Sequence, residues 1–209
     1  MQYNLIDATV HTLDGEAGKV WRVAMVPDSH KVTHLVVHQG ILLGRNVVVP
    51  IEQIDRVREG HVYLTLSNED LAQLPDYQET DFLAPEEGWE YPLGYPPGGG
   101  IWPMTMAYGG ASTYPYLSNA VLKENLPDED VSLSAGTHVE CTDGHCGEIE
   151  SVLYDEDSHE MTGFVIRRGF IFHREVKAPM SWIDHMDKER VYLKLTKRQV
   201  EEMGEYFEK

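Results

Sequence analysis

The chain has 209 residues, 42% of them hydrophobic, and a formal net charge of −18 at pH 7. This length fits one large globular domain or two small ones, and the apolar clusters at 41–43 and 47–51 are far shorter than the roughly 20 residues of a membrane-spanning helix. The acidic charge argues against binding to nucleic-acid phosphates, which requires concentrated Lys and Arg.

The amino terminus, MQYNLIDATV, lacks the basic start and apolar stretch that are typical of a signal peptide. Cys141 and Cys146 are the only cysteines. Being five positions apart, they would close a loop too small for a useful structural disulfide, so we expect free thiols and a cytoplasmic, reducing compartment.

An internal repeat organises the chain. Shifted by 129 positions, residues 10–77 align with residues 139–206 without a gap, and about 30% of the pairs are identical. The matches fall on turns and strands, and they include Asp14-Gly15 with Asp143-Gly144, Gly18 with Gly147, Asp28-Ser29-His30 with Asp157-Ser158-His159, Pro50 with Pro179, and Tyr63 with Tyr192. The chain therefore contains two copies of one structural unit.

In chain order, each copy opens with the turn signal D-G-x-x-G, which predicts strands at 20–26 and 149–154. The D-S-H triplets at 28–30 and 157–159 predict hairpin turns leading into strands 32–38 and 161–167. The two-residue period of these strands predicts which side chains face the core and which face outward. The core set is Leu35, Val37, Phe164 and Ile166, and the outward set is His34, His38, Gly163 and Arg167.

Later in each copy, strands at 46–49 and 175–178 should end at Pro50 and Pro179, and last strands are expected at 61–66 and 190–195. The pairs Ser67 with Asp70 and Thr196 with Gln199 predict capping boxes that open helices at 69–74 and 198–206. Five or six short strands and a helix in about 70 residues predict a small closed β-barrel. The expected fold class is mainly β, with tandem barrels at 1–77 and 132–209 packed on each other.

The repeated pattern resembles the PRC-barrel family. The resemblance rests on D-G-x-x-G, the D-S-H turn, the strands at 35–37 and 164–166, and the run V-x-x-P-x-x-x-I-D at 47–55 and 176–184, and it covers about two thirds of the chain. The family is named after the cytoplasmic domain of the photosynthetic reaction centre H subunit, and it includes the carboxy-terminal domain of a ribosome maturation factor. The resemblance implies a barrel that docks proteins and has no catalytic centre.

The middle segment, residues 78–131, differs from both copies. Its Pro/Gly run at 95–103 excludes long helices and central strands there, and nine acidic residues against Lys123 give it a charge of −8. It also carries eight aromatic residues, which favours an ordered connector whose aromatics pack on a barrel or on a partner. We expect interaction residues at Trp89, Tyr91, Tyr95 and Trp102, and a homodimer with Trp89 to Trp102 near the contact.

Zinc is the main chemical alternative. His138, Cys141, His145 and Cys146 are suitable ligand types, but the cysteines straddle a predicted turn, and the first copy has Thr9, Thr12, Glu16 and Ala17 in their places. We therefore interpret them as turn-flanking polar residues and small buried thiols.

Other candidates also receive structural interpretations. Three consecutive residues cannot form a catalytic triad, so both D-S-H triplets are read as turns. Asp55 and Asp184 are expected to accept backbone N–H groups, and Arg45 and Arg174 to form structural ion pairs. The basic stretches 167–168 and 194–198 are expected to be solvated surface, and no phosphate-binding or hydrolase motif is present.

Together these patterns favour a non-enzymatic adaptor without cofactor, which presents two diverged barrel surfaces to a protein partner. One alternative is small-ligand binding or catalysis in an aromatic-lined cleft between the barrels. A second, by family analogy, is a role in ribosome or RNA maturation or as an accessory of a photosynthetic complex.

Overall fold

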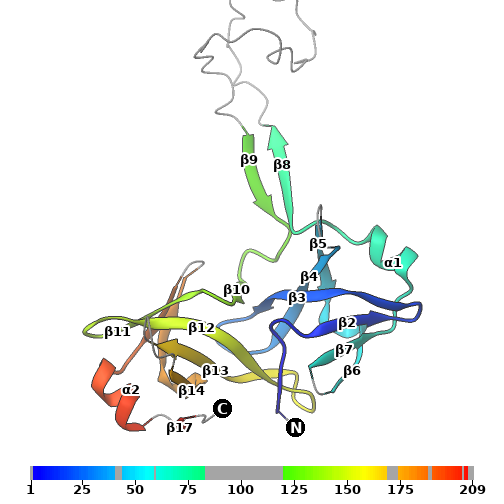
Figure 1. The fold of residues 1–209 in the computed structure, drawn as a ribbon. Helices are drawn as coiled ribbons and strands as arrows, with labels where there is room; N and C mark the ends of the chain where they lie inside the picture. Colours follow the sequence, from blue (N-terminus) through cyan, green and yellow to red (C-terminus); the bar gives the residue numbers. More distant parts are fainter. Residues whose placement is uncertain are drawn as a thin grey trace, which may run out of the picture. The chain divides into compact units, whose positions relative to one another are not determined.

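The computed structural model describes residues 2–40, 44–58, 60–82, 120–168, 174–187, 190–203 and 205–206 (Figure 1). The chain forms two compact units, of which one comprises residues 1–77 and 125–209 and the other residues 78–124. The fold is mainly β, as predicted, and its larger unit is built on two curled sheets, each roughly half a barrel.

The first sheet has the strand order β5-β4-β3-β2-β7-β6. Its strands are β2 (Thr9–Thr12), β3 (Gly15–Met25), β4 (Val32–Gln39), β5 (Arg45–Pro50), β6 (Ile54–Arg58) and β7 (His61–Leu64), and the 3₁₀ helix η1 (Ile51–Gln53) joins β5 to β6. All neighbours are antiparallel except β2 and β7, which run parallel.

The second sheet repeats this arrangement with the strand order β15-β16-β11-β12-β13-β14. Its strands are β11 (His138–Cys141), β12 (Gly144–Asp155), β13 (Glu160–Arg168), β14 (Arg174–Pro179), β15 (Ile183–Met186) and β16 (Arg190–Leu193), with η3 (Met180–Trp182) in the place of η1. Equivalent elements differ by the 129 positions of the sequence repeat. The repeat therefore predicted the shared topology.

Each copy lends its first strand to the sheet of the other copy. β1 (Gln2–Asn4) pairs antiparallel with β12 of the second sheet, and β10 (Val131–Ser134) pairs antiparallel with β3 of the first. Figure 1 shows one half of this exchange, the strand β10 beside β3. No local sequence pattern indicates it, because a strand of three or four residues can pair with either sheet.

The two D-S-H turns lie next to each other and are joined by backbone hydrogen bonds. The N–H of Val32 donates to the carbonyl oxygen of His159 (3.0 Å), and the N–H of Met161 donates to that of His30 (2.8 Å). His30 and His159 both have left-handed backbones, with φ of 57° and 58°. The predicted turns are confirmed, and they also connect the two halves around a pseudo-two-fold relation.

A single hydrophobic core runs through both halves. Leu35, Val37, Phe164 and Ile166 are all buried in it, as predicted, together with Leu133 of the exchanged strand β10. A smaller cluster on the outer side of the first sheet contains Val36, Val48 and Tyr77, with Leu126 against it.

Both predicted capping boxes are present. Ser67 Oγ accepts the N–H of Asp70 (3.1 Å) at the start of α1 (Asn68–Gln73), and Thr196 Oγ1 accepts that of Gln199 (3.3 Å) at α2 (Lys197–Met203). The second helix is shorter than the predicted 198–206. Glu205–Tyr206 instead forms β17, which pairs with β14 because the sheet edge offers backbone hydrogen bonds.

The smaller unit contains an antiparallel ribbon of β8 (Gln78–Phe82) and β9 (Ala120–Glu124), with Gln78 opposite Glu124 and Phe82 opposite Ala120. The segment between the repeats thus begins and ends as paired strands. Among the described residues, neither α-helix is long and apolar enough to cross a bilayer.

Candidate interaction surfaces on the two sheets

The outer face of the first sheet carries a cluster of His, Tyr and Arg side chains. On β2 and β7, Val10 and Val62 point into the core, so strand alternation places His11, His61 and Tyr63 on the opposite face. Arg56 of β6 joins them there. We call His11, Arg56, His61 and Tyr63 the first surface.

Side chains of the first surface contact one another closely. His11 Nε2 and His61 Nδ1 share a hydrogen bond of 2.9 Å, and the ring of His11 stacks on Tyr63 with centroids 5.0 Å apart. The guanidinium of Arg56 lies 4.6 Å from the centroid of the Tyr63 ring, within the range of a cation–π interaction. Half of the Arg56 side chain is still exposed, so the cluster is open to a partner.

The equivalent face of the second sheet lies on the equivalent strands but carries different residues. Its members are His138, Glu140, His145, His185, Arg190 and Tyr192, which we call the second surface. Glu140 Oε1 lies 3.4 Å from His145 Nδ1 and 3.6 Å from an Arg190 nitrogen, and the ring of His138 packs edge-on against that of His145 at 5.4 Å.

Tyr192 is the centre of the second surface, as Tyr63 is of the first. The His185 ring stacks on it with centroids 4.3 Å apart, in the place that Arg56 occupies over Tyr63. The hydroxyl of Tyr192 donates to Asp187 Oδ2 (3.2 Å). Partial burial and this hydrogen bond raise the pKa of Tyr192.

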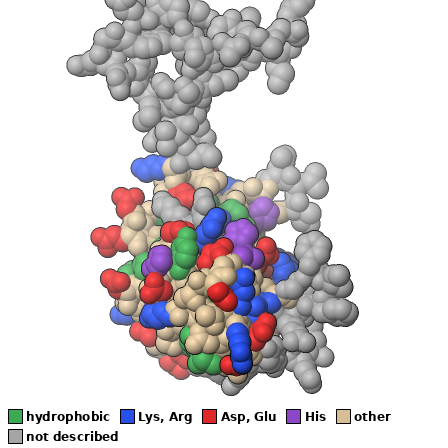
Figure 2. Space-filling view, turned by 90° about the vertical axis from the view of Figure 1, so that its left-hand side faces the viewer, with side chains coloured by type: hydrophobic (Ala, Val, Ile, Leu, Met, Phe, Trp, Pro, Cys, Tyr) green, Lys and Arg blue, Asp and Glu red, His purple; other side chains and the backbone are tan. Residues whose placement is uncertain are grey.

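At the equivalent positions of the two surfaces, one residue is retained and the others differ. Tyr63 and Tyr192 are equivalent, whereas His11 becomes Glu140, Arg56 becomes His185 and His61 becomes Arg190. Figure 2 shows the side of the molecule at the β11–β12 end, where acidic, basic and histidine side chains intermingle and hydrophobic ones form only small areas. The surfaces thus share equivalent strand positions and a tyrosine but differ in charge.

Sequence patterns alone indicate His138 and His145 only as possible zinc ligands, and Tyr63 and Tyr192 only as matched strand residues. A usable signal was present, because polar and aromatic residues alternate with buried ones along 9–12 and 61–64, and the outer residues His11 and His61 change between the copies whereas Tyr63 is retained.

A disulfide joins Cys141 to Cys146 across the β11–β12 hairpin, beneath the second surface. The prediction of two free thiols is therefore wrong, and the reducing compartment inferred from it loses its basis. A disulfide with this spacing is possible because the cysteines lie on opposite strands of the hairpin, with their Cα atoms 5.4 Å apart.

The same geometry bears on the zinc alternative. Cys141 and Cys146 are buried on the inner side of the hairpin, whereas His138 and His145 are exposed on the outer side. The four residues therefore cannot converge on one ion. In the described part of the chain, no group of three or more His, Cys, Asp or Glu side chains is arranged to hold a metal.

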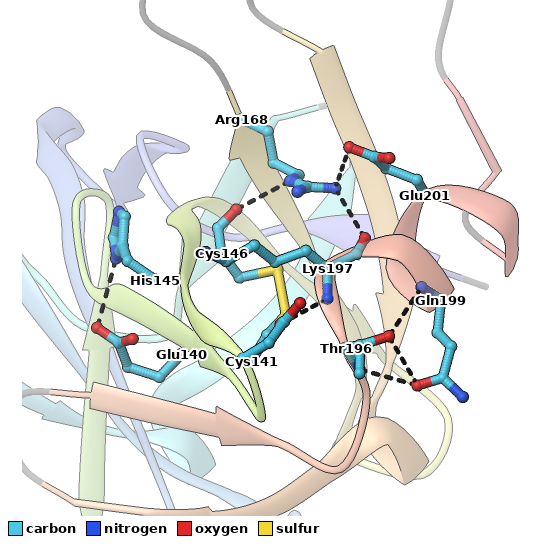
Figure 3. Close-up of a disulfide and its surroundings, with 10 residues drawn as sticks. Glu140, Cys141, His145, Cys146, Arg168, Thr196, Lys197, Gln199 and Glu201 are labelled. Atoms are coloured by element: carbon cyan, nitrogen blue, oxygen red, sulfur yellow. Dashed lines mark hydrogen bonds and ion pairs between the residues drawn. A yellow bond between two sulfur atoms is a disulfide. The ribbon is translucent and has the colours of Figure 1, made fainter.

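Hydrogen bonds attach the disulfide-bearing hairpin to helix α2 (Figure 3). Arg168 Nε donates to the carbonyl oxygen of Cys146 (2.9 Å), and its Nη1 donates to that of Lys197 (3.3 Å) and lies 3.2 Å from Glu201. Arg167 is paired with Glu148 and Glu150 at 3.0 and 3.3 Å. These arginines, considered above as a basic patch, thus have acidic or carbonyl partners within the fold.

Several other predicted residues have structural roles. Arg45 forms an ion pair with Asp76 and donates to two carbonyl oxygens at the end of α1, as expected of a structural ion pair. Asp55 and Asp184 are exposed, and their contacts are to the side chains of Arg56 and His185 rather than to backbone N–H groups. The side chain of Arg174 lies outside the described residues.

The predicted outward set needs correction at two positions. Gly163 is buried, because the backbone of Ala178 approaches it so closely that an added Cβ would lie 2.6 Å from the carbonyl oxygen of Ala178. Its equivalent His34 is only partly exposed, with Nδ1 3.7 Å from the buried carboxylate of Asp130. Trp89, Tyr91, Tyr95 and Trp102, the predicted interaction residues, lie outside the described residues.

No protein-family model matches the chain, and no curated protein is significantly similar to it.

Proposed function

We propose that this protein is a non-enzymatic adaptor that docks protein partners on the first and second surfaces. The observation that carries the proposal is the pair Tyr63 and Tyr192, equivalent in position but surrounded by different charged side chains. Tyr and Arg are enriched among the residues that dominate binding energy in interfaces. Changed charges around a retained aromatic would give each surface a different partner preference.

The duplicated architecture supports two docking sites on one rigid body. The sheets share a core and exchange strands, so a partner on each sheet would be held at a fixed separation. In this proposal the two halves are PRC-type barrels at 1–77 and 132–209, and the repeated motifs of the sequence support that assignment.

The location and assembly of the protein stay predictions. A cytoplasmic location stays a prediction, and the Cys141–Cys146 disulfide removes the support that free thiols would have given it. A homodimer through Trp89 to Trp102 rests on the aromatic content of that segment.

Affinity purification of the tagged full-length chain from its native cells tests the proposal. We expect the double variant Tyr63→Ala, Arg56→Ala to lose one set of stoichiometric partners and the double variant Tyr192→Ala, His185→Ala to lose another. Removal of interface anchors of this kind typically weakens binding by about tenfold or more.

Glu69→Ala, an exposed change on α1 away from both surfaces, is the matched control and should keep all partners. The variants should retain the circular dichroism of the wild type, because the changed residues lie outside the core. The proposal is wrong if the wild type recovers no stoichiometric partner, or if both double variants keep every partner.

A further inference from the structure

The equivalent hairpin of the first half serves as an internal comparison for the disulfide. Cys141 and Cys146 correspond to Thr12 and Ala17 of the β2–β3 hairpin, which adopts the same pairing and the same register shift without a cross-link. The disulfide is therefore not needed to form this hairpin. We therefore expect the disulfide to affect how often the end of the hairpin opens.

Two attachments, one to the first helical residue and one to the residue two positions before it, are common to both halves. Asp14 Oδ2 accepts the N–H of Asn68 (2.6 Å), and Asp143 Oδ1 accepts the equivalent N–H of Lys197 (2.9 Å). The N–H of Leu13 donates to Leu66, and that of Thr142 to Leu195, both at 2.9 Å.

A third attachment exists only in the first half. Thr12 Oγ1 donates to Asn68 Oδ1 (2.8 Å), whereas the second half has Cys141 and Lys197 at these positions. A lysine has no acceptor atom and a thiol is a weak donor, so this bond cannot form there. In the second half, Cys141 is instead bonded to Cys146 within the hairpin.

The cross-link also fixes the strands that carry part of the second surface. Cys141 follows Glu140 and Cys146 follows His145, so each sulfur is one residue from a partner of the Glu140–His145 contact. Loosening of the cross-link would free these two outer side chains first. Residues 142–145 at the end of the hairpin are already exposed.

We propose that Cys141–Cys146 is a reversible redox lock on the second surface. A dithiol reductant attacks one sulfur through its thiolate, the S–S bond breaks, and the second thiol of the reductant resolves the mixed disulfide. Two electrons and two protons pass to Cys141 and Cys146, and the reductant leaves as a cyclic disulfide. The reduced hairpin stays folded, but its end opens more often and the Glu140–His145 contact is lost.

Hydrogen–deuterium exchange on the full-length chain, before and after treatment with dithiothreitol, tests the lock. Alkylation and intact mass should show two new thiols per chain without denaturant. We expect exchange in residues 138–148 to accelerate on the order of tenfold, as loss of a small-loop cross-link allows. Residues 9–19, the uncross-linked equivalent, should not change.

A rescue variant separates the lock from a general loss of structure. Cys141→Thr, Cys146→Ala and Lys197→Asn together install the Thr–Asn attachment of the first half. This triple variant should show slow exchange in 138–148 with or without reductant, whereas Cys141→Ser with Cys146→Ser should show fast exchange in both conditions.

Three results would overturn the lock: no reduction of the native protein, unchanged exchange in 138–148 after reduction, or faster exchange that extends to 9–19. The consequence for docking rests on the proposed function, and there reduction should weaken binding at the second surface only. Because the exchange measurement needs no partner, it can succeed even if the adaptor proposal fails.

Discussion

At the scale of single residues, the pseudo-two-fold junction contains an unusual tyrosine. The Tyr154 hydroxyl is hydrogen-bonded to His159 Nδ1 (2.7 Å), and its ring is almost fully buried. Burial, with smaller contributions from the charges of Glu156 and Asp155, raises the pKa of Tyr154 from 10.0 to about 12.

A raised tyrosine pKa has a defined effect on stability. The folded state holds the phenol proton more tightly than the unfolded state, so the contribution is complete below pH 10 and is lost as the pH rises through about 12. Tyr154→Phe should lower the unfolding free energy at pH 7 by about 1 kcal/mol, through the lost hydrogen bond. In urea titrations, the unfolding free energy of the variant should also decline less between pH 10 and 12 than that of the wild type.

Tyr63→Phe, on the exposed outer face of the first sheet, is the control for that measurement. An equal alkaline decline in wild type and Tyr154→Phe would contradict the assignment.

The second glycine of each D-G-x-x-G motif is explained at the same scale. A Cβ on Gly18 would lie 2.2 Å from the carbonyl oxygen of His38, and one on Gly147 would lie 2.5 Å from that of Arg167. Both backbones also have positive φ. The repeated glycine is therefore required by close approach of the neighbouring strand as well as by backbone conformation.

Gly18→Ala and Gly147→Ala should each destabilise the protein by clearly more than about 1 kcal/mol, because strain and overlap add. Gly136→Ala is a suitable comparison, since Gly136 has a φ of 84° but open space around its Cβ position. Thermal unfolding of the three variants tests this explanation. It is refuted if Gly136→Ala lowers the melting temperature more than the other two changes do.

At the scale of elements, helix α1 is held at its start by a capping box with a charged member. A hydrogen bond from the side chain of Ser67, and then one from its backbone N–H, lowers the pKa of Asp70. The folded state therefore favours the ionised carboxylate, whose contribution is present above the unfolded pKa and lost as the pH falls through the folded pKa.

We predict that Asp70→Asn lowers stability at neutral pH and that its difference from the wild type shrinks as the pH approaches 2. Urea unfolding at several pH values between 2 and 7 checks this, and Glu69→Gln on the same exposed turn supplies the control. If the difference in unfolding free energy between Asp70→Asn and the wild type stayed constant across that range, the carboxylate would not be the group responsible.

At the scale of the whole molecule, strand exchange should make the two halves unfold together. Leu133 lies on β10, which belongs by sequence to the second copy and by pairing to the first sheet, and its side chain is fully buried. A change at this position therefore affects both halves at once.

Leu133→Ala should cost about 2–5 kcal/mol, as is usual for a buried leucine, and should preserve a single unfolding transition. Exchange rates of amides in β4 and β13 report on the two halves separately and should rise in parallel. Independent transitions, or an effect confined to one half, would show that the halves are energetically separate.

The sequence by itself determined whatever depends on neighbouring residues and on register. The gapless repeat, the turns at 28–30 and 157–159, the capping boxes at Ser67 and Thr196, and the burial of Leu35, Val37, Phe164 and Ile166 all follow from local conformational preference and strand periodicity. These are properties of short segments, and the structure agrees with them.

Only the tertiary structure decided which distant segments meet. Whether β1 and β10 pair with their own sheet or with the other one depends on the packing of the whole core. The Cys141–Cys146 bond depends on hairpin geometry rather than on sequence separation, and Gly163 is buried because Ala178 of another strand approaches it. The first surface combines residues of β2 with those of β6 and β7, and the second combines residues of β11 and β12 with those of β15 and β16, so only the folded sheet brings these distant segments together.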